Sequence, residues 1–213
     1  LMPGAARTWA GGLFTPSDMR AEPWLAVPAL ARDAVALGAV IVEGCAARAL
    51  YREGGRVAGL VTERGLIRAP EVVVAGGAWS ALFLRREGVW LPQLSVKATV
   101  AQTVPLAAVF PGGAADGELG WRPRADGGYS IAPGSAHTFW IGPDAFRAFR
   151  HYLPQLRRDF RSTSFRPWAP RGYPDAWSTP RRWAEDAQSP FERMRVLDPA
   201  PDPKLVAGLA TAL

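Results

Sequence analysis

The chain has 213 residues, of which 48% are hydrophobic, so it has enough apolar content for one or two packed cores. A single cysteine, Cys45, excludes an internal disulfide, and no apolar run approaches the ~20 residues that a membrane-spanning helix needs. The first residues lack the basic start and apolar core of a secretory signal, and the formal net charge is +6. We therefore predict a cytoplasmic protein without a membrane span.

The first predicted helix covers residues 23–37. Pro23 suits a first helical position, apolar residues and alanines follow it, and Gly38 ends the helix. Gly38 leads directly into residues 39–43, whose sequence AVIVE is typical of a strand. Helix and strand are thus predicted to be joined by a tight turn.

Three short strands are predicted next, at residues 46–52, 56–62 and 66–68. The links between them, Gly54-Gly55 and residues 63–65, are so brief that only antiparallel neighbours are possible. The sequence therefore predicts a three-stranded meander.

Residues 71–80, EVVVAGGAWS, combine a β-branched run with bare backbone. Residues 72–74 are apolar on both faces, as expected of an inner strand of a sheet that is covered on both sides. Gly76 and Gly77 then remove the side chains where the strand ends, which is where open α/β sheets bind ligands. The segment predicts either a site at which something flat or phosphorylated approaches the backbone, or a tight turn without a ligand before a helix at residues 78–87.

The chain beyond this helix is interpreted as a second domain. Residues 94–101 alternate between apolar and polar side chains, which is the pattern of a strand with one buried face. Asp126-Gly127 is a strong hairpin signal between strands predicted at residues 120–124 and 128–132.

A further strand, predicted at residues 137–141, leads into a strongly amphipathic helix. Asp144 is predicted to cap this helix. Its buried stripe is predicted from apolar residues spaced three and four apart: Phe146, Phe149, Leu153, Leu156 and Phe160. Residues 203–213 are also apolar-periodic and predict another helix.

The net charge comes from one segment of the chain. Residues 145–182 hold nine arginines against Asp159 and Asp175, so the rest of the chain is close to neutral. We interpret the arginines first as a basic solvent face beside an ordinary core stripe. Arginines among aromatic residues also occur where proteins grip single-stranded nucleic acid. Because these aromatics lack a regular spacing, a protein contact or an oligomer surface is favoured over nucleic acid.

Other catalytic and metal-binding arrangements are excluded by the residues present. His137 and His151 are the two histidines, fourteen residues apart and without acidic or cysteine residues at metal-ligand spacing, so no metal site is predicted. Cys45 is interpreted as a small core residue. We assign no catalytic acid or base.

Residues 38–80 resemble the central part of the FAD-dependent oxidoreductases of the D-amino-acid oxidase superfamily, the glycine oxidase and sarcosine oxidase kind. The resemblance is carried by GAVIVEGCAARAL, by the meander and by AGGAWS, and AGGLFTPSDMRAEP and GWRPRADGGYSI also look like family segments. It implies FAD as the cofactor. The cofactor contacts that it implies, with the first at the adenine end and the others along the flavin, are Ala47, Ala75, Gly76, Gly77 and Trp79.

The resemblance also implies a fold and a reaction. The fold is α+β or α/β: a partial Rossmann-like FAD-binding domain with a β-meander insertion at residues 1–90, an antiparallel-sheet substrate domain at 91–198, and a return to the FAD domain at 199–213. The implied substrate contacts are Arg122 and Tyr129, although an arginine on a hairpin is more often solvated. The implied reaction oxidises the C–N bond of an amino acid or secondary amine to an imine, and the electrons pass to oxygen or another acceptor.

One departure from the family concerns the cofactor phosphates. The sequence has no G-x-G-x-x-G turn, whose backbone N–H groups and helix dipole would bind the FAD diphosphate. The C-terminal segment that closes over the flavin is also not found. We therefore expect an internal fragment of an oxidase that binds FAD weakly and is inactive alone. The alternative is a non-enzymatic basic interaction module that binds an anionic partner through residues 145–182.

Overall fold

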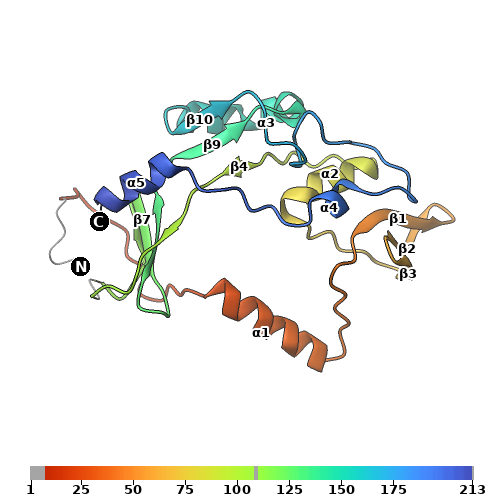
Figure 1. The fold of residues 1–213 in the computed structure, drawn as a ribbon, viewed down its shortest axis with the longest axis horizontal. Coiled ribbons are helices and arrows are strands. Elements are labelled where there is room, and N and C mark those ends of the chain that lie inside the picture. Colours follow the sequence, from red (N-terminus) through yellow and green to blue (C-terminus); the bar gives the residue numbers. More distant parts are fainter. Residues whose placement is uncertain (1–7, 108–109, 213) are drawn as a thin grey trace. The chain divides into compact units, whose positions relative to one another are not determined.

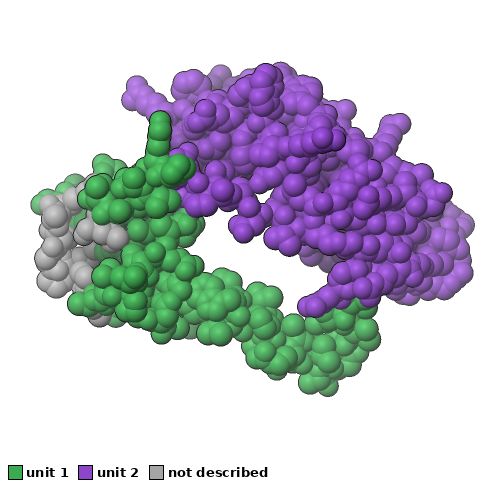
Figure 2. Space-filling model, viewed as in Figure 1, with its two compact units in different colours: residues 1–42, 100–134, 203–213 green, residues 43–99, 135–202 purple. Residues whose placement is uncertain are grey.

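The computed structural model describes residues 8–107 and 110–212, which form a mixed α/β fold with three small sheets in the described part (Figure 1). The chain divides into two compact units, each built from separate stretches of sequence (Figure 2). Unit 1 comprises Leu1–Val42, Val100–Gly134 and Pro203–Leu213, and unit 2 comprises Glu43–Thr99 and Ser135–Asp202. These units group the chain differently from the three predicted segments, whose assignment to a cofactor and a substrate domain stays a prediction.

The described residues of unit 1 form two helices and one antiparallel sheet. The helices are α1 (Pro23–Ala36) and α5 (Pro203–Ala212). The strands, in their order across the sheet, are β5 (Ala101–Gln102), β8 (Tyr129–Pro133), β7 (Leu119–Pro123) and β6 (Ala114–Ala115). The core of this unit forms where α5 packs on the sheet, and its buried members are Tyr129, Ile131 and Leu209.

The predicted hairpin is confirmed as β7 and β8. Arg124 N–H donates to the carbonyl of Gly128 at 2.8 Å, and Gly127 N–H donates to the carbonyl of Arg124 at 3.2 Å. Gly127 has a φ of 84°, which favours glycine, and the Asp126 carboxylate accepts a hydrogen bond from Gly128 N–H at 3.0 Å. The turn chemistry read from the sequence therefore sets this register.

The helix predicted at residues 23–37 is confirmed by α1, but the strand predicted directly after it is wrong. Residues 39–42 are exposed and have no regular secondary structure, and no strand pairs with them within the described part of the chain. A β-rich sequence forms a strand only where a neighbour satisfies its backbone N–H and C=O groups. The apolar pattern of AVIVE is typical of a strand, but it cannot specify that neighbour.

Unit 2 contains the confirmed meander, which is an antiparallel sheet in the order β1 (Ala47–Glu53), β2 (Arg56–Thr62) and β3 (Gly65–Arg68). Its second sheet has β9 (His137–Trp140) at the centre, with β10 (Thr163–Arg166) parallel to it and β4 (Val96–Lys97) antiparallel. The helical elements are η1 (Gly77–Trp79), α2 (Ser80–Arg86), α3 (Pro143–Asp159) and α4 (Pro190–Arg193). The predicted helix at residues 78–87 is thus confirmed as η1 and α2.

Two predicted strands of this region are wrong. Residues 72–74 have no regular secondary structure and no partner strand in the described chain, and Val73 is 90% exposed rather than buried. Residues 94–101 do not form one strand, because β4 and β5 pair with strands of different sheets. Thr99, between them, is buried, and its hydroxyl accepts a hydrogen bond from Asp202 N–H at 3.2 Å. Between β4 and β5, the side-chain hydrogen bond of Thr99 therefore takes the place of backbone hydrogen bonds between strands.

The buried face of α3 differs from the predicted one. The N-cap is Gly142, whereas Asp144 lies in the first turn, is only 5% exposed and forms an ion pair with Arg85 of α2. Asp144 N–H donates to the Asp175 carboxylate at 2.9 Å, so another side chain caps the helix. Asp144 and Ala148 face the interior, and three of the predicted core residues are exposed: Phe146, Phe149 and Phe160. The apolar spacing predicted a different buried face. The ion pair of Asp144 with Arg85 fixes the rotation of the helix about its axis.

The helix predicted at residues 203–213 is confirmed as α5, which buries Leu209. Among the described helices, none has both the length and the apolar character needed to cross a membrane.

Candidate functional site

The predicted cofactor residues all lie in unit 2. Ala47 is the first residue of β1 and pairs with Thr62 of β2. The other four residues lie where the chain enters η1: Ala75, Gly76, Gly77 and Trp79.

The backbone of residues 75–77 is exposed and free of covering side chains. Gly77 has a φ of 54°, and a Cβ built there would meet nothing within 4 Å. A Cβ on Gly76 would meet only its near neighbours, with Ser80 Oγ at 3.5 Å. Within the described part of the chain, no acceptor is found for the amide N–H groups of Gly76 and Gly77. This stretch, which we call the glycine tip, is therefore open to a ligand.

The carbonyl groups of the glycine tip are fixed by neighbouring residues. Trp79 N–H donates to the carbonyl of Gly76 at 3.0 Å, and the Gln93 side-chain amide donates to the carbonyl of Gly77 at 3.0 Å. Gln93 also accepts a hydrogen bond from Ala81 N–H at 3.1 Å, which ties the tip to the first turn of α2. The backbone of the glycine tip is thus held in place through its carbonyl groups.

Trp79 is held in an aromatic cluster around Phe191 of α4. Its ring meets the ring of Phe191 edge to face, with centroids 5.3 Å apart. Phe191 makes the same kind of contact with Trp183 at 5.3 Å and a tilted contact with Phe83 at 6.1 Å. Such pairs each contribute roughly 0.5–1.5 kcal/mol beyond area burial. The cluster anchors the residue that follows the glycine tip.

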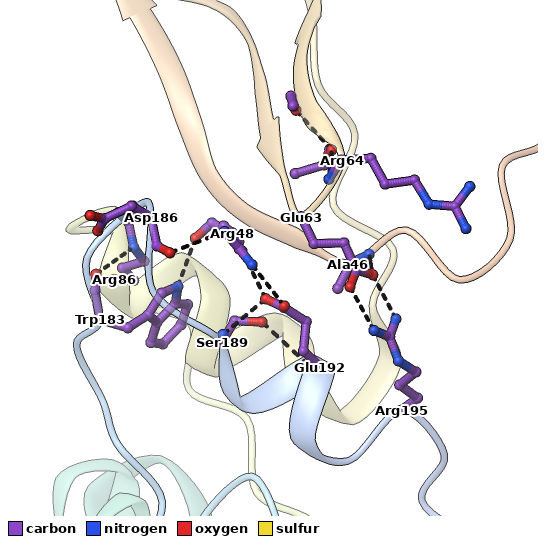
Figure 3. Close-up of polar contacts among 12 residues, drawn as sticks. Ala46, Arg48, Glu63, Arg64, Arg86, Trp183, Asp186, Ser189, Glu192 and Arg195 are labelled. Atoms are coloured by element: carbon purple, nitrogen blue, oxygen red, sulfur yellow. Dashed lines mark hydrogen bonds and ion pairs between the residues drawn. The ribbon is translucent and has the colours of Figure 1, made fainter.

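The residues on either side of Ala47 are also fixed (Figure 3). Ala46 N–H donates to the Glu63 carboxylate at 2.7 Å, and the Trp183 indole N–H donates to the carbonyl of Arg48 at 2.8 Å. The Arg48 guanidinium binds Glu192 of α4 through two hydrogen bonds of 2.9 Å each. The start of β1 is therefore held on both sides.

α4 links the two sets of predicted cofactor residues, because Phe191 contacts Trp79 and Glu192 binds Arg48. A capping box holds this four-residue helix: Glu192 N–H donates to Ser189 Oγ at 3.3 Å, and Ser189 N–H donates to the Glu192 carboxylate at 2.9 Å. The sequence signal was present as Ser189-Pro-Phe-Glu192, but our sequence analysis missed it.

The charges beside β1 are paired. Two hydrogen bonds from Arg48 lower the pKa of Glu192 to about 2, and two hydrogen bonds from Arg195 lower the pKa of Glu63 to about 2. Both Arg48 and Arg195 have raised pKa values because of these same hydrogen bonds. The four groups are therefore charged at neutral pH and balance one another.

A hollow of about 370 Å³ lies on one face of the sheet formed by β4, β9 and β10. Strand register places Lys97 opposite Thr138 and Trp140 opposite Arg166, and alternation puts all four side chains on the same face. Trp168 and Asp202 also line the hollow.

Charge and aromatic character give the hollow its chemistry. Neither Lys97 nor Arg166 forms an ion pair with any described residue, so both cations are available to an anion. Trp140 is half-buried and packs edge to face on Tyr173, with centroids 5.3 Å apart, whereas Trp168 is largely exposed. The arrangement fits a ligand that carries a carboxylate and an apolar or aromatic group. Sequence analysis missed this site because the parallel pairing of β10 with β9 has no local signal.

The predicted substrate residues Arg122 and Tyr129 lie in unit 1. Arg122 donates to the carbonyl of Ala21 at 3.2 Å and pairs with the Glu22 carboxylate at 3.5 Å. Tyr129 is only 7% exposed and belongs to the core of that unit. Both side chains are therefore engaged in their own unit, and a substrate contact by either stays a prediction.

No group of three His, Cys, Asp or Glu side chains among the described residues could hold a metal ion. His137 is occupied within its own sheet, because Nδ1 lies 2.9 Å from the Ser135 carbonyl and Nε2 lies 3.0 Å from Thr163 Oγ1. Cys45 is half-buried just before β1.

Comparison with known proteins gives a consistent result. A protein-family model described as "FAD dependent oxidoreductase" matches residues 1–210. The D-amino acid dehydrogenase of Sinorhizobium medicae is 43% identical over 97 residues, which cover 46% of this chain and 23% of that protein. The D-amino acid dehydrogenase of Allorhizobium ampelinum is 33% identical over 183 residues, which cover 77% of this chain and 42% of that protein.

Solved structures agree. The L-amino acid deaminase of Proteus myxofaciens, determined in complex with anthranilate, matches with a TM-score of 0.77 and 30% identity, over 86% of this chain and 41% of that chain. The L-amino acid deaminase of Proteus vulgaris matches with a TM-score of 0.75 and 30% identity, over 88% of this chain and 43% of that chain. The chain thus spans less than half the length of these relatives.

Proposed function

The chain belongs to the family of FAD-dependent oxidoreductases, and we propose that it supplies cofactor-binding and substrate-binding residues to an enzyme that oxidises the C–N bond of an amino acid. The observation that carries the proposal is the glycine tip, where backbone N–H groups are exposed and no side chain covers them. Bound FAD would accept a hydride from the carbon that bears the amine.

The residues present fit the flat part of this cofactor. Gly76 and Gly77 offer N–H donors to an acceptor at the edge of a ring, and Ala47 offers the backbone at the start of β1 for the adenine end. α4 keeps both segments in place through Trp79 and Arg48. The diphosphate is a different case, because the sequence has no G-x-G-x-x-G turn.

The hollow is proposed as the place where the substrate is recognised. Arg166 and Lys97 would bind the carboxylate, and Trp140 and Trp168 would contact the side chain. Tryptophan side chains beside the two cations would strengthen their contacts with a carboxylate, because the local dielectric constant is lower than in water. The deaminase of similar structure was solved with anthranilate, which is an aromatic carboxylate, and this supports the assignment of ligand class.

The finer architecture is part of the same proposal. The meander, the glycine tip and α2 would belong to a Rossmann-like FAD domain, and the sheets that follow would belong to a substrate domain. This domain was predicted to be antiparallel, but its β9–β10 pair is parallel. The electron acceptor is oxygen or another carrier.

Titration of FAD with the purified chain tests the cofactor proposal. We expect saturable quenching of flavin fluorescence, and we expect Gly76→Val to raise the Kd at least about tenfold, since its side chain stands between ligand and backbone. Gly12→Val is the control, because a Cβ at Gly12 meets nothing within 4 Å and Gly12 lies outside the glycine tip. An unchanged Kd in Gly76→Val would show that the glycine tip does not contact the cofactor.

Calorimetry with benzoate as the probe tests the hollow. Arg166→Met and Lys97→Met should each weaken benzoate binding about tenfold, whereas the uncharged benzamide should bind poorly to every variant. Arg161 is exposed and lies just after α3, so Arg161→Met removes the same charge at another position and serves as the control. If Arg122→Met weakens binding and Arg166→Met does not, the substrate contact predicted from sequence is correct and the hollow is not the site.

A further inference from the structure

α3 exposes an apolar stripe to solvent. At about 100° per residue, its members fall on one side of the helix: Phe146, Phe149, Leu153 and Phe160. The three phenylalanines are 66%, 53% and 62% exposed. Trp177, which is 56% exposed, lies beside the stripe with its ring 6.2 Å from that of Phe146. An amphipathic helix normally buries such a stripe, so this one is available to a partner.

A row of arginines borders the stripe. The exposed arginines of this helix and the turn after it are Arg147, Arg150, Arg157, Arg158 and Arg161. None of them forms an ion pair with a described acidic residue. A recess of about 650 Å³ lies where the two rows meet, lined by Leu156, Phe160 and three of the arginines. The partner must therefore be apolar on one side and anionic on the other.

We propose that this surface, which we call the α3 surface, docks onto an anionic lipid bilayer with the helix lying in the plane of the interface. A helix of 17 residues is about 25 Å long, so it lies along the interface rather than across the bilayer. Phenylalanines and a tryptophan enter the boundary between headgroups and acyl chains, and the arginines extend along that boundary to the lipid phosphates.

The arrangement of the aromatics favours a bilayer over nucleic acid. Proteins bind single-stranded nucleic acid with aromatic side chains interspersed among basic ones, so that successive bases stack on the aromatic rings while the basic groups bind the phosphates. On the α3 surface the phenylalanines form one row and the arginines form another, which matches the layered chemistry of a lipid interface. The complementary charge comes from anionic headgroups, which attract juxtaposed basic residues. This inference is independent of the proposed oxidase activity.

Co-sedimentation of the chain with vesicles tests the inference. We expect binding to vesicles of phosphatidylcholine mixed with phosphatidylglycerol to exceed binding to pure phosphatidylcholine by about tenfold or more. Phe149→Ser/Phe160→Ser and Arg157→Gln/Arg158→Gln should each reduce binding severalfold. All four residues are exposed, and circular dichroism checks that both variants remain folded.

Matched controls use exposed residues of the meander and of the segment that follows it. Arg52→Gln/Arg56→Gln removes the same charge, and Val73→Ser removes an exposed apolar side chain, so both should bind vesicles as the unmodified chain does. Equal binding to both kinds of vesicle overturns the proposal. If only the arginine variant loses vesicle binding, the chain adsorbs to the charged headgroups without inserting its phenylalanines. This result also overturns the proposal.

Other partners would be revealed by the same variants. Binding of an oligothymidine that the phenylalanine variant loses, without vesicle binding, identifies a nucleic-acid surface and overturns the proposal. A dimer in sedimentation equilibrium that the phenylalanine variant dissociates, without vesicle binding, identifies a second copy of the chain instead. A longer polypeptide that contains this chain and does not bind the vesicles would likewise overturn it.

Discussion

Gly59 lies in the central strand of the meander, where a side chain has no room. It pairs with Tyr51 on one side and with Arg68 on the other. A Cβ at this position would collide with the backbone carbonyl of Ile67, and a backbone atom cannot move aside as a flexible side chain can. The residue is therefore required by the close approach of β3.

We expect Gly59→Ala to lower the free energy of unfolding by about 1–3 kcal/mol, since overpacking forces the strands apart. Urea denaturation followed by circular dichroism measures the change. Gly117→Ala is the control, because its Cβ meets nothing within 4 Å, and it should change the free energy by less than about 0.5 kcal/mol. Equal free energies of unfolding for the two variants would mean that β3 moves away from a side chain at position 59 without loss of stability.

At the scale of an element, α4 is short, yet it determines how the start of β1 and the glycine tip are held. Four residues cannot form a stable helix on their own, since nucleation is costly. The capping box, the ring of Phe191 and the ion pair of Glu192 supply the missing stability. The segment just after α4 is further connected to the meander by the ion pair of Arg195 with Glu63 at 2.7 Å.

These two ion pairs predict a pH dependence of stability. Glu63 and Glu192 titrate near their ordinary pKa of 4.5 when the chain is unfolded, whereas folding lowers the pKa of each to about 2. A carboxyl group with a lowered pKa stabilises the folded state above its unfolded pKa, and the contribution is lost as the pH falls toward the folded pKa. We expect the free energy of unfolding to decrease as the pH is lowered from about 5 to about 2.

Urea denaturation across this pH range measures the effect. Glu63→Gln/Glu192→Gln should be less stable at neutral pH and should show a flatter pH dependence. Glu43→Gln/Glu71→Gln changes two exposed carboxylates and should keep the full dependence. If Glu63→Gln/Glu192→Gln keeps the full pH dependence of stability, other carboxylates cause that dependence.

At the scale of the whole molecule, each compact unit has its own buried residues. Unit 1 buries Tyr129, Ile131 and Leu209, where α5 packs on β8. Unit 2 buries Leu82 and its neighbours on α2. Separate cores allow separate opening, because a unit loses its own apolar contacts without exposing those of the other.

We expect Ile131→Ala to destabilise unit 1 by about 2–5 kcal/mol, because the deletion leaves a cavity in a small core. Hydrogen exchange with mass spectrometry should show faster exchange in β7, β8 and α5, with β1 and β2 unaffected. Leu82→Ala should give the opposite pattern. Faster exchange throughout the chain in either variant would indicate one cooperative unit.

Elements with local signals could be predicted from the amino-acid sequence. Asp126-Gly127 and Gly54-Gly55 set the turns of the hairpin and the meander, and Gly38 ended α1, because the backbone angles of a turn depend on its own few residues. The segments that resemble the oxidoreductase family, including the glycine tip, were likewise recognised from consecutive residues, and the family is confirmed.

Features that depend on contacts between distant residues could not be predicted from local sequence patterns. The parallel pairing of β10 with β9 brings Arg166 to Trp140 and Lys97, the ion pair of Asp144 with Arg85 sets which face of α3 is buried, and α4 connects Trp79 with Arg48. Periodicity states that a segment has an apolar face, but not which partner covers it. For the same reason, residues 39–43 and 72–74 have strand sequences without strand pairing in the described chain, since a ladder needs a neighbour that no local pattern can specify.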